Sequence, residues 1–486
     1  MRKVIVSLLL IMVLIVSSVS TVVYARQPDK AYTYDGEDAV PSTNAYQVKK
    51  IVDETVMGTT QLSNPTDIFV DAKDRTFVLD AGNSRILILD TDYRCIKELK
   101  EFNYNGEIHT LAKDAQGMFF REINQWLYVA DTENNRIIVT DLDGNVKNIY
   151  EKPVDELLDP KDQYKPKKII VDNMGIMYVT SGTINTGALL VDSANNFLGF
   201  YGINRIKATA EILMEYFWRS ILTDAQNAQS LLSIQPIEFN NIFWTEDRFV
   251  YAVSNLSDSV ESAVVKLNAL GKNVFPQPVD FSTIATNSGQ KTMRLTDLTV
   301  DNEGAITILE SDRGRLYQFD SGCNLLVVFG GIGYQKGSFT MPVSIESDSN
   351  NNLLVLDATK NTITVMEQTF YGQKIRQANH LYNQGLYEES VAPWKEVLRM
   401  NANYTQAYVG MGKAYMSMGE YETAMEYFKL GYDQANYGVA KAALREERVR
   451  ENFALIAVVV FIAMISILAS DQLKALFSGI YWRLKK

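Results

Sequence analysis

The sequence predicts a multidomain protein made of a six-bladed all-β propeller, an all-α stalk and a C-terminal transmembrane helix. Three observations support this prediction. Short runs of β-branched and aromatic residues that end in Asp recur at a period of roughly 40 residues, which is typical of propellers and solenoids. The hydrophobic period changes from two to a helical period at Tyr371. An apolar run without charges extends from Phe453 to Ser470, which is about the minimum length for crossing a bilayer.

The N-terminus carries the features of an export signal. Two basic residues precede an almost uninterrupted apolar stretch that ends at Val23, and small residues stand before a cleavage position after Ala25. Residues 1–25 are therefore either a cleaved signal peptide or an uncleaved N-terminal anchor, and the sequence leaves both open. Either one exports the bulk of the chain. We expect residues 26–45 to form an extended linker.

Four short strands separated by turns make up the first repeat, as in one blade of a propeller. The same pattern predicts six blades within residues 46–370. They lie at 64–102, 108–151, 165–202, 236–275, 294–332 and 340–368. The last blade contains only three strands, so we expect residues 46–53 to supply its outer strand. Closing the ring in this way removes exposed sheet edges, which otherwise promote aggregation.

The polar residues of the repeat carry a resemblance to a known family. In the first two blades the residues that carry it are Pro65 and the polar residues Asp71, Asp80, Asn83, Arg85, Asp131, Asn135 and Arg136. These blades resemble NHL-repeat propellers, and the resemblance implies that the Asp and Arg residues are structural and tie adjacent hairpins together. Some propellers that resemble this one are enzymes, namely amidating lyases with histidine-bound zinc and lactonase-like hydrolases with a Glu/Asn/Asp calcium site.

Residues 371–452 follow a helical period. Gly412, Tyr415 and Phe428 occupy characteristic positions of a tetratricopeptide repeat that starts near Thr405, and a matching set lies about 34 residues earlier. The stretch resembles two tetratricopeptide repeats followed by a third helix, and Gly412 is expected to let two helices approach closely. Two such repeats either form a groove for a peptide or partner helix, or act only as a spacer.

The apolar run at residues 453–470 predicts a transmembrane helix, which anchors the chain in the lipid bilayer and places residues 471–486 in the cytoplasm. Apolar residues of this tail recur at helical spacing opposite Lys and Arg, which predicts an amphipathic helix in the membrane interface. Its interface residues are Tyr481, Trp482, Arg483, Lys485 and Lys486. We therefore expect a single-pass or double-pass protein of the cell membrane, with the bulk of the chain extracytoplasmic.

Composition excludes one class of function. The chain has 47 Lys and Arg against 58 Asp and Glu, a net charge of −11, and nucleic-acid binding needs a basic footprint. We therefore expect no nucleic-acid partner. Cys95 and Cys323 are predicted to occupy equivalent positions in two separate repeats. Such positions lie beyond the reach of a disulfide, so both thiols are expected to be free.

The sequence shows no catalytic motif. Its two histidines, His109 and His380, cannot supply a His-rich zinc set, and no Gly-Xaa-Ser-Xaa-Gly element or phosphate-binding loop occurs in context. We therefore expect no catalytic residues, no metal, no cofactor and no enzymatic activity. The alternative is a surface-tethered, lactonase-like hydrolase with a carboxylate calcium site, because Asp and Asn abound in the turns. Such residues usually satisfy the turn itself.

An insertion at residues 203–235 interrupts the repeat between the third and fourth blades with a helical pattern that contains aromatic residues. It opens on the propeller face that also carries the second turn of every blade. The candidate binding residues on this face are Tyr216, Trp218, Asn83, Asn135 and Asn185. We expect them to bind a membrane protein, peptide or glycan, as in a scaffold or an accessory subunit of a transporter or envelope complex. The alternative is that the helix only caps the propeller.

Overall fold

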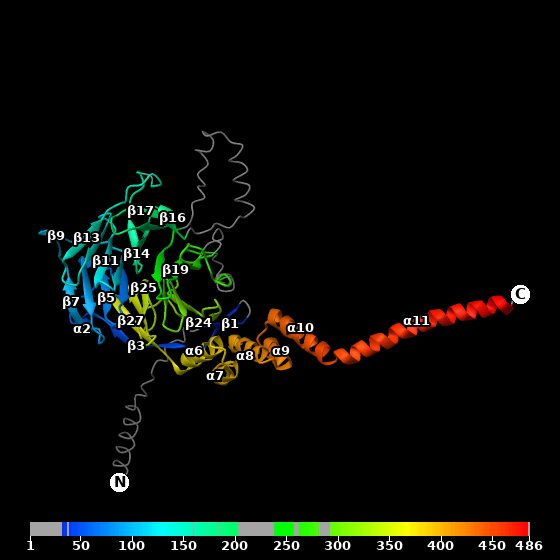
Figure 1. Ribbon diagram of the computed structural model, residues 1–486. Helices are drawn as coiled ribbons and strands as arrows, with labels where there is room; N and C mark the ends of the chain where they lie inside the picture. The colour runs from blue at the N-terminus through cyan, green and yellow to red at the C-terminus, as the bar shows by residue number, and fades with distance from the viewer. Residues whose placement is uncertain are drawn as a thin grey trace, which may run out of the picture. The chain divides into compact units, whose positions relative to one another are not determined.

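The computed structural model describes residues 32–35, 38–158, 160–182, 184–202, 238–256, 262–279, 281 and 292–484. The chain divides into two compact units, Met1–Gln373 and Lys374–Lys486. Strands dominate the first unit and helices make up the second (Figure 1).

Six of the antiparallel sheets in the described part of the first unit are blades, and their inner strands close into a ring. Each inner strand contacts the next one along the chain, and the last contacts the first. The predicted six-bladed propeller is therefore confirmed. Blade 1 contains β4 (Asp67–Val70), β5 (Thr76–Asp80), β6 (Arg85–Leu89) and β7 (Cys95–Leu99); blade 2 contains β10 (Gly117–Arg121), β11 (Trp126–Asp131), β12 (Arg136–Thr140) and β13 (Val146–Tyr150); blade 3 contains β14 (Pro166–Val171), β15 (Met177–Ser181), β16 (Ile184–Val191) and β17 (Phe197–Tyr201).

The second half of the ring is less regular. Blade 4 contains β18 (Asn241–Trp244), β19 (Val250–Val253) and β20 (Val264–Leu267); blade 5 contains β21 (Leu295–Val300), β22 (Ile306–Glu310), β23 (Arg315–Phe319) and β24 (Leu325–Gly330); blade 6 contains β25 (Pro342–Ser347), β26 (Leu353–Asp357), β27 (Thr362–Gln368) and β3 (Tyr46–Val52). Short connecting elements are α2 (Glu54–Met57), the 3-10 turn η1 (Ala81–Asn83), β8 (Phe102–Tyr104) and β9 (Glu107–His109).

The N-terminal strand closes the ring as predicted. β3 pairs antiparallel with β27, with Val52 opposite Ile363 and Tyr46 opposite Gln368. The segment before it differs from the expected linker, because β1 (Tyr32–Asp35) and β2 (Asp38–Pro41) form a hairpin there. This hairpin continues the sheet of blade 5, since β1 pairs with β24. An outer strand offers unpaired backbone groups, which explains why it takes up another strand.

Blade 4 lacks the predicted fourth strand within the part of the chain that the structure describes. Residues 268–275 instead form a turn and a single bridge between Leu267 and Asn273. Pro276 and Pro278 follow directly, and a proline cannot donate a ladder hydrogen bond. These prolines explain why the strand does not continue.

Asp and Asn side chains fix the turns between strands. Asp71 Oδ1 accepts hydrogen bonds from the backbone N–H groups of Lys73 and Arg75 at 3.0 and 2.8 Å. The same double contact recurs at Asp90, Asp141, Asp172, Asp192, Asn268, Asp301, Asp320 and Asp348. The abundance of these residues in the turns is therefore structural.

The hydrophobic core lies between neighbouring blades. Phe77 of blade 1 stacks on Phe120 of blade 2 with ring centroids 4.9 Å apart. Across the closure, Val78 packs in one cluster with Leu354 and Leu356 of blade 6. Because every blade buries both of its faces in this way, each repeat depends on its neighbours for stability.

Both cysteines are free, as predicted. Their expected equivalence is wrong, however. The turn that begins at Asp320 places Cys323 in the left-handed position at φ 65°, which Tyr93 occupies at φ 67° in the turn that begins at Asp90. Cys95 lies two positions further along, at the start of β7. The two Asp-led turns have the same length, and Leu325 rather than Cys323 is the equivalent of Cys95, because Leu325 pairs with Phe319 as Cys95 pairs with Leu89.

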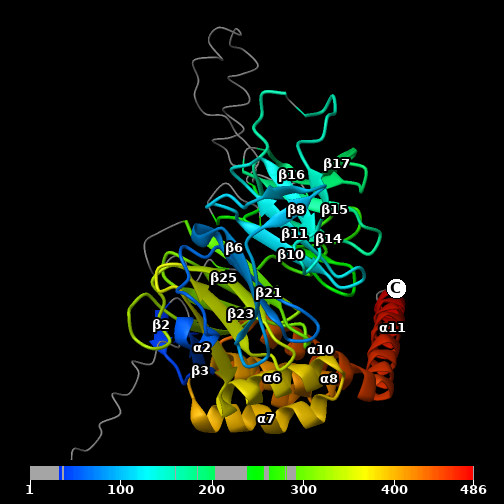
Figure 2. The same cartoon turned by 90° about the vertical axis from the view of Figure 1, so that its left-hand side faces the viewer.

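The second unit consists of antiparallel helices and one long terminal helix. They are α6 (Phe370–Asn383), which begins in the first unit, α7 (Tyr387–Met400), α8 (Thr405–Ser417), α9 (Tyr421–Leu430), α10 (Gln434–Glu451) and α11 (Phe453–Leu484) (Figures 1 and 2). Two glycines allow close packing. A Cβ on Gly410 would lie 2.6 Å from the Trp394 ring, and one on Gly412 would lie 2.7 Å from the Phe428 ring. The expected role of Gly412 is confirmed.

No single described helix has both the length and the hydropathy that a membrane span needs, whereas Gln434–Glu451 and Phe453–Ile467 have them together across a bend of 68°. The predicted boundary between span and tail does not interrupt the backbone, because α11 continues to Leu484.

Candidate functional site

One position of each inner strand points toward the axis of the propeller. In blades 1, 2, 5 and 6 it pairs with the residue that precedes the last residue of the second strand. In blade 3 the position lies in an irregular stretch of the β14–β15 pairing, and in blade 4 it pairs with Val253, the last residue of β19. In both blades it lies four residues before the first turn, as in blades 1, 5 and 6. The six positions are occupied by Asp67, Gly117, Lys168, Asn241, Asp297 and Ser344, which we call the inner ring. The sequence analysis missed this ring, although in four blades it lies four residues before the Asp of the first turn.

Asp67 connects four blades. Its Oδ1 accepts hydrogen bonds from Lys168 Nζ at 2.5 Å and from Ser344 Oγ at 3.0 Å. Its Oδ2 accepts from the backbone N–H of Met118 at 2.8 Å. These donors belong to blades 3, 6 and 2, so one carboxylate from blade 1 joins them across the axis. Hydrogen bonds to a charged group are the stronger kind.

Asp297 makes the corresponding connections on the other side of the ring. It accepts hydrogen bonds from the amide of Asn241 in blade 4 and, at 2.8 Å, from the backbone N–H of Ile345 in blade 6. Burial raises the pKa of Asp297 to about 6, although the positive charge of Lys168 opposes this shift. Desolvation disfavours the charged form of a carboxyl group, and here it outweighs the attraction to the ammonium.

Glu346 lies two residues beyond Ser344 on β25 and adds a third carboxyl group. Its Oε2 accepts a hydrogen bond from Thr299 Oγ1 at 3.3 Å. Burial raises the pKa of Glu346 well above its ordinary value, and the negative charges of Asp297 and Asp67 raise it further. The site therefore favours the protonated form of Glu346.

Lys168 is the ammonium group of this site. Burial lowers its pKa, but the charges of Asp67 and Asp297 outweigh burial, so the pKa is raised overall. Gly117 makes room for it. A Cβ at Gly117 would lie 2.2 Å from the carbonyl oxygen of Lys167 and 3.1 Å from Cδ of Lys168. Glycine at this ring position lets the lysine of blade 3 pass blade 2 and reach Asp67.

The residues present do not fit a calcium ion. Three carboxyl groups converge, but Lys168 already lies among them and would repel a divalent cation. Calcium needs six to eight oxygen ligands, and the described residues contain no group of three or more His, Cys, Asp or Glu side chains placed to hold a metal.

Two residues beyond the inner ring, the inner strands of blades 1 and 2 carry aromatic side chains. Phe69 and Phe119 meet there edge to face, with centroids 5.5 Å apart.

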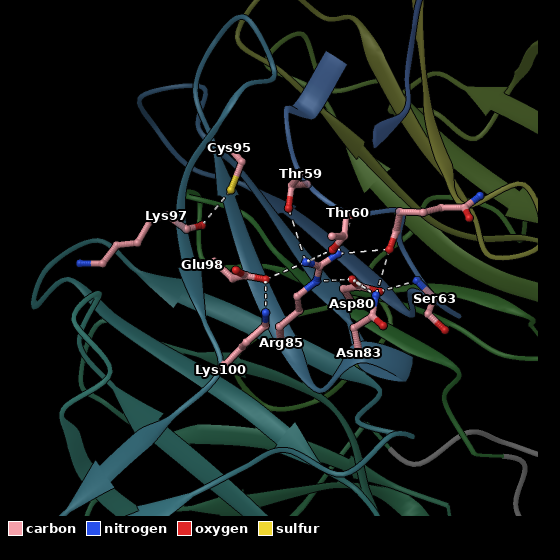
Figure 3. A network of polar contacts seen from close by, with 11 residues as sticks. Thr59, Thr60, Ser63, Asp80, Asn83, Arg85, Cys95, Lys97, Glu98 and Lys100 are labelled. Atoms are coloured by element: carbon pink, nitrogen blue, oxygen red, sulfur yellow. Dashed lines mark hydrogen bonds and ion pairs between the residues drawn. The ribbon is translucent and has the colours of Figure 1, made fainter. Parts of the chain in front are cut away.

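The Asp and Arg of the repeat are structural, as the resemblance implied. Arg85 is 1% exposed, and its Nε donates to Asp80 Oδ2 at 2.5 Å (Figure 3). Its two terminal nitrogens donate to Thr60 Oγ1, Glu98 Oε1 and the carbonyl oxygen of Thr60 at 2.6–2.8 Å. In blade 2, Arg136 Nε contacts Asp131 in the same way at 2.8 Å.

The predicted binding residues are not brought together by the described part of the structure. Asn83 is used internally, since its amide donates to Asp80 Oδ2 at 2.8 Å and to the carbonyl oxygen of Gln61 at 3.0 Å. Asn135 is exposed and holds the left-handed turn position at φ 55°. The side chain of Asn185 in β16 and all of Tyr216 and Trp218 lie outside the described residues, as does the insertion at 203–235.

The predicted membrane-interface residues lie among positions 481–486. Tyr481, Trp482 and Arg483 belong to the backbone of α11. Their side chains, together with Lys485 and Lys486, lie outside the described residues.

The known proteins that match this chain are distant solved structures. No protein family and no curated protein matches the sequence. Solved structures do match. Virginiamycin B lyase from Staphylococcus aureus is 11% identical with a TM-score of 0.36, covering 67% of this chain and 88% of that one. A gluconolactonase from Xanthomonas campestris is 12% identical with a TM-score of 0.40, covering 70% and 100%. A protein of unknown function from Bacteroides thetaiotaomicron is 14% identical with a TM-score of 0.41, covering 66% and 73%.

These neighbours correct one expectation. The chain was predicted not to be an enzyme, yet the lyase and the gluconolactonase that it matches are enzymes. The missing His-rich zinc set and the missing nucleophile motif therefore do not exclude catalysis on this fold. At these identities and TM-scores the likeness assigns no particular activity to this chain.

Proposed function

We propose that the chain is a membrane-anchored, extracytoplasmic binding protein that presents its propeller and helical repeats to a protein or glycan partner at the cell surface. The observation that carries this proposal is the surface of α11. Every side chain from Phe453 to Ile467 is exposed, and most are large and apolar. Each such side chain gains about 1.5–3 kcal/mol when it leaves water, so the segment is stable only in an apolar surrounding.

Two features of the sequence support the orientation and the role. The basic start and the apolar stretch up to Val23 direct export, which puts the propeller outside and the tail after Ser470 inside. The spacing of α6 to α9 agrees with the tetratricopeptide resemblance, because α8 starts 35 residues after α6. Such repeats act as partner-binding stalks, as in an accessory subunit of a transporter or envelope complex.

Membrane retention tests the anchor. Membranes that carry the full chain are washed at alkaline pH, and wild-type protein should stay in the pellet. Phe461→Lys should release a large share, since a charge near the middle of a span costs about 2.5–3.5 kcal/mol. Tyr432→Lys, a matched change at an exposed aromatic between α9 and α10, should have no effect. Wild-type protein that washes off would refute the anchor.

A crosslinked pull-down from intact membranes tests the binding role. The propeller-bearing protein should recover one dominant partner in stoichiometric amount, and alkaline-washed membranes without crosslinker should lose it. Recovery of only abundant, unrelated proteins at scattered ratios would contradict a dedicated partner.

The inner ring favours a second candidate, a hydrolase. The raised pKa values of Asp297 and Glu346 beside Lys168 are of the kind found at acid–base sites. In this candidate, a water molecule attacks the carbonyl carbon of an ester or lactone, and protonated Glu346 donates a proton to the oxygen that leaves as the C–O bond breaks. Purified protein should then hydrolyse members of a lactone panel in the presence of a chelator. Glu346→Gln should abolish the activity, and Glu367→Gln on the outer part of blade 6 should not. An inactive wild-type protein across the panel would exclude this candidate.

A further inference from the structure

A groove lies within the helical unit at the junction of three helices. It has a volume of about 980 Å³ and is lined by α9, α10 and the first turn of α11. Apolar side chains of Met425, Val449 and Ile456 form one part of its wall. Ile456 belongs to the apolar segment that the proposed function places in the membrane.

The groove also carries an excess of positive charge. Four basic and two acidic side chains line it. Arg448 is paired with Glu422. The other cations are Lys429, Lys441 and Arg445, and none of the described residues forms an ion pair with them. Lys441 and Arg445 are exposed on α10, four residues apart and therefore on one face of the helix.

The bend between α10 and α11 determines how far the basic side chains of α10 lie from the membrane surface. The two helices meet at 68°. If α11 crosses the bilayer along its normal, α10 runs within about 22° of the membrane plane. Lys441 and Arg445 then lie at the level of the lipid head groups, directly outside the span that starts at Phe453. Basic side chains at this level attract anionic lipids.

We propose that this groove binds an anionic phospholipid of the extracytoplasmic leaflet of the membrane. Its phosphate lies against Lys441 and Arg445, and an acyl chain lies along Val449 and Ile456. The proposal rests on the membrane anchor of the proposed function and adds a defined lipid site to it. Charge complementarity selects the head group, and continuity with the apolar span selects a lipid over a soluble phosphate.

Lipid binding by full-length protein in detergent tests the site. Fluorescent short-chain phosphatidylglycerol is titrated and its anisotropy measured, with labelled phosphatidylcholine as the neutral probe. Phosphatidylglycerol should bind more tightly. Lys441→Gln with Arg445→Gln should weaken its binding about 30-fold, as expected for two basic groups at an anionic head group. The matched pair Lys395→Gln with Lys413→Gln, on α7 and α8 and away from the groove, should leave it unchanged.

Further measurements separate the possible failures. The charge-keeping variant Lys441→Arg with Arg445→Lys should restore binding, and circular dichroism should show equal helix content in all variants. Equal affinity for both lipids, or no effect of the groove variant, would overturn the lipid site. Full competition by glycerol phosphate at similar affinity would also overturn it and assign the groove to a soluble phosphate. In the alkaline wash the groove variant should stay with the membrane, whereas loss of wild-type protein there would refute the anchor instead.

Discussion

Replacing Lys168 by Met tests whether the inner ring holds the propeller together. The Lys168 side chain is 13% exposed and its partner Asp67 is 6% exposed, with 2.5 Å between Nζ and Oδ1. Removing one member of a buried pair typically costs about 3–5 kcal/mol, because the other charge is left without compensation. We expect the free energy of unfolding to fall by about that amount at pH 8.

The pH dependence of the loss follows from Asp297. Its pKa is about 6 in the folded protein against an ordinary value of 3.8, so between these values the folded state binds more protons than the unfolded state. Stability therefore falls as pH rises through this window, by roughly 3 kcal/mol at 1.36 kcal/mol per pKa unit. Lys168 opposes the shift, so Lys168→Met should raise the pKa of Asp297 further and extend the decline above pH 6. The variant should be nearer to wild type at pH 5 than at pH 8.

The neighbouring lysine provides the control. Lys167 lies on the same strand and pairs with Glu238 at 2.7 Å, but these side chains are 28% and 27% exposed. A pair this exposed contributes at most about 1 kcal/mol, so Lys167→Met should cost little. The assay is urea unfolding of the detergent-solubilised protein at both pH values, followed by hydrogen exchange in peptides from β4, β14 and β21. If both variants lose the same stability, or if the loss is independent of pH, the inner ring does not hold the blades as described.

Three further predictions follow from the same contacts. Arg85→Met should lower the free energy of unfolding by about 3–5 kcal/mol and Arg136→Met by less, because Arg136 is 16% exposed, and thermal unfolding measures both. Burial raises the pKa of both thiols, that of Cys323 to about 12. Cys95 and Cys323 should therefore react slowly with a thiol reagent in native protein, and completely after denaturation without reductant. A disulfide between them would contradict this. Protease added to intact cells should remove the propeller and the helical repeats but spare the last residues, and a protected propeller would reverse the orientation.

The propeller could be predicted from the sequence because the repeated residues contact partners that lie only a few residues away in the chain. Asp71 closes a turn within five residues, and Asp80 and Arg85 meet across one hairpin. The turn contact recurs in every blade and reveals the period, and the Asp–Arg pair recurs in blade 2. The expected equivalence of Cys95 and Cys323 was wrong because the two cysteines stand at different positions of turns that have the same length. Blade 4 has no fourth strand among the described residues, because Pro276 and Pro278 interrupt the backbone ladder there.

The inner ring could not be recognised from the repeat, because its members differ from blade to blade. A structural position that repeats the same residue is visible by self-similarity, whereas this one reads Asp, Gly, Lys, Asn, Asp and Ser. Only the closed ring brings Asp67 and Lys168 together, 101 residues apart in the chain. The identity of the group at each position makes sense only beside its partner across the axis.

This asymmetry suggests what the ring does for folding. The local turns stabilise any number of identical blades in any order, so they cannot fix which blade faces which. The contacts of Asp67 with blades 2, 3 and 6 exist only when six blades are closed in the correct order. Gly117 adds to this, since a Cβ there would lie 2.2 Å from the carbonyl oxygen of Lys167 and prevent the close approach of blades 2 and 3. A buried polar network that is satisfied in one arrangement alone disfavours the others, because each leaves a charge unpaired. The inner ring therefore selects the closed propeller from the alternatives that a repetitive sequence permits.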